Sequence, residues 1–374
     1  MNQQVVTPIG ELLDDIRHGK MVVVLDERGG RANEGVVLVA AEHCTAEHIT
    51  FMARRARGLV CLALTHERCV QLNLPPMAGQ DDKDTARFTL SIEASQGIDT
   101  GISAADRAHT VRVAVAPRAA PGDIVQPGHI FPLAAEPGGV LVRAGHTESG
   151  VDIARLAGLV PAAVIADVLD ERGDLADGPA LLTFAQQYGL RVGSIADLIH
   201  YRTANERTIE RIREGDLETR YGVFKLVVYR DHIHGGIHMA LQRGTIEEDQ
   251  PTLVRVHVST TLRDLLAVEE RGVHGWSAQT ALETIANEGS GVLVLLERRE
   301  SDSELLNSVD LGLGLSSPRE AQPGDSYNTV GTGSQILRDL GVGKIRLMGA
   351  PIKYNAISGF GLEVMEYLEP DARA

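Results

Sequence analysis

Short apolar segments alternate with amphipathic helical patterns over the first 205 residues of the chain. MVVVLDE (21–27), LVCLALT (59–65) and PAAVIADVLD (161–170) have the length and composition of buried strands, and PIGELLDDIRHG (8–19) has a helical pattern. Strands and helices in alternation bury their apolar faces most readily as a sheet covered by helices. The sequence therefore predicts an α/β domain over residues 1–205.

The second part of the chain has a different pattern. YGVFKLVVYRD (221–231), GGIHMALQRG (235–244) and TLVRVHVST (252–260) are closely spaced strand-like segments, which favours antiparallel pairing. Helical patterns follow at SAQTALETIANEG (277–289) and SQILRDLG (334–341). These segments predict an α+β domain over residues 206–374.

Charge and composition exclude several classes of partner. The chain carries 36 Lys and Arg against 51 Asp and Glu, a formal net charge of -15, which repels nucleic acid and acidic membranes. No apolar run reaches the length of about 18 residues that a membrane span needs. The N-terminal residues lack the apolar core of a signal peptide, and the three cysteines, Cys44, Cys61 and Cys69, are an odd number. We expect a cytoplasmic protein without a disulfide framework.

RAGHTE (143–148) is the strongest candidate for a binding site, because it lies where a strand pattern gives way to a helix. Arg143 offers a planar fork for phosphate, and Thr147 with the N–H groups of the helix start can complete an anion site. His146 could bind a metal ion or transfer protons. The alternative is a capped helix with an incidental histidine. The convergence of these groups within a few residues favours the functional interpretation.

Two further segments carry candidate residues. DERGGRANEG (26–35) follows a buried strand, and its carboxylates could bind a divalent cation or act as a base, although an ordinary solvated turn is favoured for this segment alone. His129 lies in PGHIFP (127–132), where the prolines would hold it in place for catalysis. A lone histidine of this kind is more often structural.

Four long motifs, in order, resemble 3,4-dihydroxy-2-butanone 4-phosphate synthase of riboflavin biosynthesis. They are FMARRARGLVCLALT (51–65), FTLSIEASQGIDTGISAADRAHT (88–110), PGHIFPL (127–133) and GGVLVRAGHTESGVDIARLAGLVPAAVI (138–165). The resemblance covers residues 8–205. It implies an α/β homodimer with active sites near the dimer interface. It also implies a lyase that takes ribulose 5-phosphate and, with Mg²⁺ or Mn²⁺, releases C4 as formate.

The resemblance also implies roles for individual residues. His146 and Glu34 would bind the metal ion, and His129, Asp167 and Glu34 would act in catalysis. The residues implied to bind the substrate are Arg31, Arg143, Ala144, Gly145 and Thr147.

The chain departs from the family pattern at three chemical positions. The family loop reads Arg-Glu-Asn-Glu-Gly-Asp, whereas this chain has Ala32 at the metal-ligating carboxylate and Val36 at the substrate-contacting Asp. Asp167 stands where the family has a catalytic Glu. A methyl group cannot bind Mg²⁺, so another carboxylate would have to replace the one lost at Ala32. The candidates are Glu34, Glu27 and Asp26.

The second half resembles the GTP cyclohydrolase II domain that is often fused to this synthase, chiefly over residues 330–367. That enzyme holds Zn²⁺ with three cysteines, but this chain has no Cys after Cys69, and Thr260 stands where the first is expected. RGVHGWS (271–277) replaces the later pair, and ERRESDSELL (297–306) replaces the Gly-Arg-Gly phosphate loop. We therefore predict no zinc and no GTP hydrolysis.

Three histidines of DHIHGGIH (231–238), namely His232, His234 and His238, could suggest a substitute zinc site. The alternation of side chains along a strand and a turn at the glycines explain this spacing equally well, so the structural interpretation is favoured.

Three functions remain open from the sequence. The first is a Mg²⁺-dependent lyase of the butanone-phosphate synthase type with an inert second domain. The second is a repurposed paralogue that acts on another phosphorylated or enolisable substrate, which the changes at Ala32, Val36 and Asp167 favour. The third is a non-catalytic binding or regulatory protein.

Overall fold

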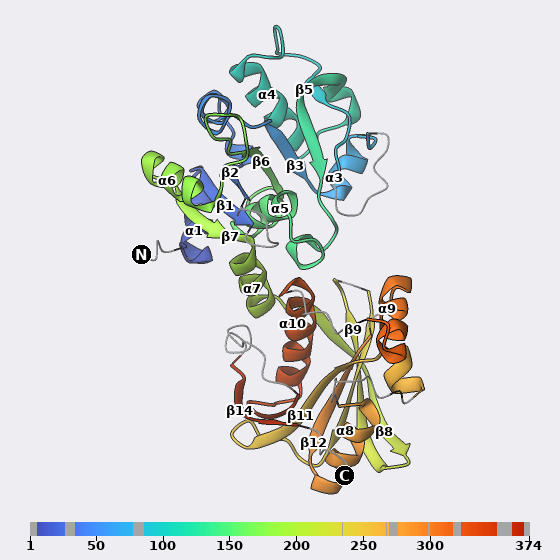
Figure 1. The fold of residues 1–374 in the computed structure, drawn as a ribbon. Coiled ribbons are helices and arrows are strands. Elements are labelled where there is room, and N and C mark those ends of the chain that lie inside the picture. The colour runs from blue at the N-terminus through green and yellow to red at the C-terminus, as the bar shows by residue number, and fades with distance from the viewer. Residues whose placement is uncertain are drawn as a thin grey trace. The chain divides into compact units, whose positions relative to one another are not determined.

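The chain divides into two compact units, Met1–Arg202 and Thr203–Ala374 (Figure 1). The computed structural model describes residues 6–26, 34–77, 86–233, 235–266, 268, 276–297, 300–316, 323–349 and 361–369. The domain boundary expected from the sequence, between residues 205 and 206, falls at the end of α7, Ile195–Asn205. No described helix combines the length and the apolar character needed to cross a bilayer.

The described strands of the first unit form a seven-stranded sheet in the order β4-β5-β3-β6-β2-β1-β7. The pairs β1–β7 and β3–β5 are parallel and the others are antiparallel, so the sheet is mixed. The strands are β1 Val22–Asp26, β2 Glu34–Ala40, β3 Cys61–Leu64, β4 Ile92–Ala94, β5 Ile124–Ala134, β6 Ala162–Asp167 and β7 Arg191–Ser194.

Helices cover both faces of this sheet, which explains why its central strands are apolar along their whole length. The longer helices are α1 Ile9–Arg17, α2 Ala46–Phe51, α3 His66–Gln71, α4 Ala104–Val115, α5 His146–Leu156 and α6 Gly178–Tyr188; the shorter helical turns are η1 Ala41–His43, η2 Met52–Ala56, η3 Pro121–Asp123 and η4 Gly139–Leu141. Residues of α2, α4 and α6 share one core with Val23 and Val37. On the other face α5 lies so close to the sheet that a Cβ at Gly150 would be 3.0 Å from the Cβ of Ala163.

Three local expectations for the first unit were wrong. Residues 121–133 look like a Pro- and Gly-rich loop, but Ile124–Ala134 is a strand that pairs with both β3 and β4. The apolar run at 139–142 looks like a strand, but Gly138 and Gly139 have φ of 93° and 63°, and a short 3-10 turn, η4, forms instead. The pattern at 104–115 is a single helix rather than a helix that leads into a strand.

The second unit also has a mixed seven-stranded sheet among its described residues, in the order β14-β13-β11-β12-β10-β9-β8. The strands are β8 Ile209–Thr219, β9 Gly222–Asp231, β10 Ile237–Arg243, β11 Pro251–Val258, β12 Gly291–Leu296, β13 Lys344–Met348 and β14 Glu363–Leu368. Its helical elements are η5 Thr261–Leu265, α8 Ala278–Glu288, α9 Asp302–Leu313 and α10 Pro323–Asp339.

The pairing of these strands corrects the sequence-based expectation in part. The antiparallel pair β9–β10 is confirmed. The strand β11 instead lies between β12 and β13 and is parallel to both. Residues 194–215 have a helical pattern, but α7 ends at Asn205 and residues 209–219 form β8, which pairs with β9. A long antiparallel partner thus overrides the local helical pattern of this segment.

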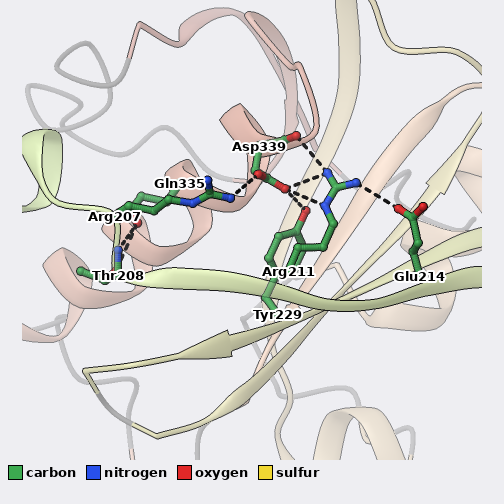
Figure 2. Close-up of polar contacts among 7 residues, drawn as sticks. All are labelled: Arg207, Thr208, Arg211, Glu214, Tyr229, Gln335 and Asp339. Atoms are coloured by element: carbon green, nitrogen blue, oxygen red, sulfur yellow. Dashed lines mark hydrogen bonds and ion pairs between the residues drawn. The ribbon is translucent and has the colours of Figure 1, made fainter.

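A polar cluster connects α10 to the start of β8 within the second unit (Figure 2). Asp339 accepts hydrogen bonds from Arg207 at 2.8 Å, from Arg211 at 2.7 Å and from the buried hydroxyl of Tyr229 at 2.8 Å. One turn earlier, the Gln335 side chain accepts the Thr208 N–H at 2.9 Å and donates to the carbonyl of Glu206 at 3.0 Å. The carboxylate is compensated by two guanidinium groups, as a partly buried charge requires.

Candidate active site

The first unit contains a pocket of about 500 Å³ at the edge of its sheet where β1 and β6 end and α5 begins. The residues that line it are Asp26, Val36, Leu59, Cys61, Ala86, Phe88, Leu133, Arg143, Ala144, Gly145, His146, Thr147, Glu148, Ile165, Ala166 and Asp167. The whole RAGHTE segment therefore faces one cavity, together with the two aspartates that end β1 and β6. The structure thus brings together Arg143 and Asp167, which lie far apart in the sequence.

One wall of the pocket is built to bind an anion. The helix α5 begins at His146, and its N-cap, Gly145, provides no side-chain cap. The first N–H groups of such a helix are available to a ligand, and the helix dipole favours negative charge there. Arg143 precedes this helix start and Thr147 lies within its first turn, with 6% of its surface exposed. A guanidinium, a hydroxyl and a helix N-terminus thus converge at one point.

Two aspartates, Asp26 and Asp167, also line the pocket. Asp26 and Glu34 are cross-strand partners in the β1–β2 register, and Asp167 is the partner of Val36 in the β2–β6 register. Asp167 is the exposed last residue of β6, and partial desolvation beside the pocket raises its pKa, which the negative charge of nearby Glu34 raises further. Carboxylates that repel one another in this way favour a bound cation or a shared proton.

The residues present are compatible with Mg²⁺, which commonly uses one or two protein carboxylates and completes its coordination with water and substrate oxygens. Asp26 and Asp167 line the pocket and supply such oxygens, and His146 lines it too. Glu34, expected as a metal ligand, is not among the lining residues, although it is the cross-strand partner of Asp26. No group of three or more His, Cys, Asp or Glu side chains converges into a complete metal site among the described residues. The loop 27–33, with Glu27, Arg31 and Ala32, lies outside them.

His129 lies outside the set of residues that line the pocket. It belongs to β5, its side chain is 42% exposed, and its Nδ1 atom is 2.6 Å from Oε1 of Glu93. Its catalytic role therefore stays a prediction. The role of Arg31 stays a prediction as well, because the loop that carries it lies outside the described residues.

Sequence reasoning missed the apolar part of the pocket and one thiol. Leu59, Phe88 and Leu133 line the cavity, as does Cys61. Burial raises the pKa of the Cys61 thiol to about 12, so it stays protonated at neutral pH and is a poor nucleophile. All three cysteines are buried free thiols, as the sequence predicts. Cys61 and Leu133 lie within the motifs 51–65 and 127–133 that resemble the family. Side chains alternate between the two faces of a strand, and this alternation was the signal that could have assigned both residues to the face of the pocket.

In the second unit, no three His, Cys, Asp or Glu side chains come together among the described residues. Thr260, at the position expected for a cysteine, donates its N–H to Asp264 at 2.8 Å. The same carboxylate accepts from Nε2 of His257 at 2.9 Å. Burial lowers the pKa of His257, so the imidazole is neutral and serves as a donor inside this network. His274 lies outside the described residues.

The histidines of residues 231–238 support the structural interpretation. His238 is 4% exposed, its Nδ1 accepts the N–H of Glu297 at 3.0 Å, and its Nε2 is 3.4 Å from Asp231. His232 is exposed and pairs with Glu210. His234 lies outside the described residues.

The fold and the pocket define a class of protein, namely a mixed α/β protein whose pocket combines an anion site at a helix start with clustered carboxylates. Comparison with known proteins makes this specific. The family model of 3,4-dihydroxy-2-butanone 4-phosphate synthase matches residues 10–201, and that of GTP cyclohydrolase II matches residues 210–369. The chain belongs to the 3,4-dihydroxy-2-butanone 4-phosphate synthase family, with a GTP cyclohydrolase II domain fused to its synthase domain.

Individual relatives resemble the chain over its whole length. It is 51% identical to the 3,4-dihydroxy-2-butanone 4-phosphate synthase of Pseudomonas syringae pv. tomato, over 96% of this chain and 97% of that protein. A two-domain 3,4-dihydroxy-2-butanone 4-phosphate synthase from A. baumannii has a TM-score of 0.81 and 46% identity, over 97% of this chain and 100% of that one. A synthase of the same name, solved with two magnesium ions, matches 53% of this chain and 98% of its own, with a TM-score of 0.51 and 38% identity.

Proposed function

We propose that the chain is a Mg²⁺-dependent lyase that converts ribulose 5-phosphate to 3,4-dihydroxy-2-butanone 4-phosphate and formate. The observation that carries this proposal is the single pocket in which Arg143 and the start of α5 face Asp26 and Asp167. The two products together contain all the atoms of the substrate. The reaction therefore requires no second substrate site.

The anion wall of the pocket would bind the phosphate. Arg143 would contact its oxygens with the N–H groups of Gly145 and the first turn of α5, and Thr147 would add a hydroxyl donor. A phosphate bound there fixes the position of the carbon chain, which is worth several powers of ten in a reaction with successive proton transfers. Leu59, Phe88 and Leu133 would exclude water from the remainder of the substrate.

The carboxylates would hold the metal ion and move protons. Asp26, Glu34 and His146 are the groups we assign to Mg²⁺ or Mn²⁺, which when bound stabilises negative charge on neighbouring substrate oxygens. Asp167, whose pKa is raised above that of an ordinary carboxyl group, would take up and return protons. His129 would serve as a further acid or base.

A second function is favoured by one feature of the pocket wall. Val36 lines the pocket and is 1% exposed, where the family pattern has an aspartate. An apolar side chain there removes a polar contact to substrate. A related phosphorylated and enolisable compound is therefore the second candidate, bound through the same phosphate site.

We propose no GTP hydrolysis by the second unit, because Thr260 stands where the first zinc-binding cysteine is expected and RGVHGWS (271–277) replaces the later pair. We also propose that the chain forms a homodimer, as family membership suggests. Sedimentation velocity over a range of concentrations tests the dimer: a single monomer species throughout would contradict it.

The lyase proposal is tested by formate release from ribulose 5-phosphate. Purified protein with Mg²⁺ should release one formate per substrate consumed, and chelation of the metal should stop the reaction. Asp26→Asn and Glu34→Gln should each weaken the activation by Mg²⁺, and Asp174→Asn, at a surface position, is the matched control. Consumption of the substrate without formate would favour the second candidate, and no consumption would reject both for this substrate.

A further inference from the structure

Two buried acids on α5 contact the segment that delivers Arg143 to the pocket. Glu148 is 0% exposed and Asp152, one turn later, is 3% exposed. Oε1 of Glu148 accepts the backbone N–H of Glu136 at 3.0 Å. Oδ2 of Asp152 accepts the backbone N–H of Val140 at 2.8 Å. Each acid therefore holds one backbone group of residues 136–140.

The backbone of this segment is shaped to lie directly on the carboxylates. A Cβ at Gly139 would be only 2.3 Å from Oδ2 of Asp152, and the φ of 63° at this position also favours glycine. The carbonyl of Gly139 then accepts the N–H of Arg143 at 3.0 Å. The contact of Asp152 with residues 139 and 140 therefore fixes the backbone turn that ends at Arg143.

Both acids also interact with arginines that contact or belong to this segment. Arg202 donates from Nη1 to Asp152 and to the carbonyl of Gly138, both at 2.7 Å, so it joins the acid and the turn. Glu148 lies 3.6 Å from Nη1 of Arg143. Its second oxygen has no hydrogen-bond partner among the described residues and would be 2.5 Å from a Cβ at Gly145. The carboxylate of Glu148 therefore lies against both Arg143 and the N-cap of α5.

We propose that Glu148 and Asp152 are positioning residues that hold residues 136–143 on α5 and thereby place the Arg143 guanidinium for the substrate phosphate. This inference rests on the proposed function, because it assigns phosphate binding to Arg143. Neither acid is expected to touch the reacting carbons. Buried carboxylates that bond to backbone N–H groups fix the conformation of a segment more firmly than apolar packing does.

The test is a double-mutant cycle with KM for ribulose 5-phosphate, kcat and the Kd of inorganic phosphate as readouts. Glu148→Ala should raise KM and the phosphate Kd by roughly tenfold or more, with a much smaller change in kcat. In an Arg143→Ala background the same substitution should change KM and Kd by less than about twofold, because the group that it positions is absent. Effects that multiply in the double variant would overturn the proposal, since they indicate independent structural damage.

Conservative variants keep the proposal testable if Glu148→Ala fails to fold. Glu148→Gln keeps the length and one acceptor for the N–H of Glu136, so its KM should stay within about threefold of the wild-type value. Glu148→Asp keeps the charge but is one methylene shorter, so it should raise KM more than the Gln variant does. A larger rise in KM for Glu148→Gln than for Glu148→Asp would show that the charge of the side chain matters more than its length, and it would overturn the positioning role.

The phosphate titration also separates this proposal from the proposed function. If wild-type protein binds inorganic phosphate but releases no formate, the lyase assignment fails while the cycle on phosphate Kd still decides the positioning role. If formate is released and the cycle is additive, the lyase assignment stands and the positioning role fails.

Discussion

At the scale of single residues, Arg143 is the group on which phosphate recognition depends most in this pocket. Its planar fork matches phosphate oxygens, and hydrogen bonds of this charged type contribute about 1.5–3 kcal/mol each. Arg143→Ala should raise KM for ribulose 5-phosphate roughly 10- to 100-fold, measured by steady-state formate release. Arg172→Ala is the matched control, because that side chain is 80% exposed and pairs only with nearby surface acids in the described contacts. Equal KM values for the two variants would contradict the assignment.

Asp167 is expected to lower stability while it supports activity. Its raised pKa means that ionisation is harder in the folded chain than in the unfolded chain. The resulting penalty is absent below the ordinary carboxyl pKa, grows as the pH rises through the raised pKa and persists at neutral pH. Because the side chain is exposed to solvent, the effect is small: Asp167→Asn should have a slightly higher Tm than the wild type at pH 7, with a difference that disappears near pH 3. Its kcat should fall on the order of 10²-fold or more.

Differential scanning calorimetry at several pH values checks the stability of the Asp167→Asn variant. Asp174→Asn provides the comparison, because Asp174 is 73% exposed in the segment that follows β6. A Tm of Asp167→Asn below that of the wild type at pH 7 would show that the carboxylate is stabilising rather than strained.

At the scale of elements, the start of α5 shows how much of the site the sequence predicts. Arg143, Ala144, Gly145, His146 and Thr147 all line the pocket, because the motif itself describes a helix N-terminus. The turn η4 in front of it was mistaken for a strand, since its apolar residues say nothing of the positive φ values at the two glycines. Burial of acids cannot be read from composition, so Glu148 and Asp152 look like ordinary solvated helix positions.

The order of strands shows a second limit. The apolar runs predict that strands exist, and β1, β3 and β6 lie where expected. Local pattern does not identify partners, so the parallel pairing of β11 with β12 and β13 was missed. The strand β5 was missed for a related reason: its prolines and glycines favour a loop, yet both neighbouring strands supply backbone partners.

The polar cluster around Asp339, which connects α10 to the start of β8, is expected to stabilise the second unit. Asp339 is 19% exposed on its side chain and accepts from two arginines and from Tyr229. Asp339→Ala should lower the free energy of unfolding by about 2–4 kcal/mol, because it leaves the buried Tyr229 hydroxyl without its acceptor. Chemical denaturation followed by circular dichroism measures this. Glu214→Gln touches the same Arg211 from a 51% exposed position and should cost less than about 1 kcal/mol. Equal losses of unfolding free energy in Asp339→Ala and Glu214→Gln would contradict the stabilising role of the polar cluster.

At the scale of the whole molecule, the chain joins a synthase domain to a domain of the GTP cyclohydrolase II family that has no cysteines. In the synthase unit, Arg143 and the start of α5 line the same pocket as Asp26 and Asp167. The second unit retains a seven-stranded sheet, while the described residues around Thr260 form a protein hydrogen-bond network.

The second unit is therefore expected to bind no stoichiometric zinc. Purified chain, analysed by inductively coupled plasma mass spectrometry, should contain well under one zinc per chain, and incubation with GTP and added Zn²⁺ should release no formate. The zinc content is measured without any assay of activity, so it tests zinc binding independently of catalysis. One tightly bound zinc per chain, together with formate from GTP, would contradict this account of the second unit.

The fate of a single carbon atom tests the central claim most directly. Ribulose 5-phosphate labelled with ¹³C at C4 is incubated with the protein and Mg²⁺, and the products are followed by ¹³C NMR. The account predicts that the label appears in formate alone, one formate per substrate consumed, and that Arg143→Ala slows this transfer at low substrate concentration. Label that remains in a phosphorylated product, or substrate that persists unchanged, would contradict it.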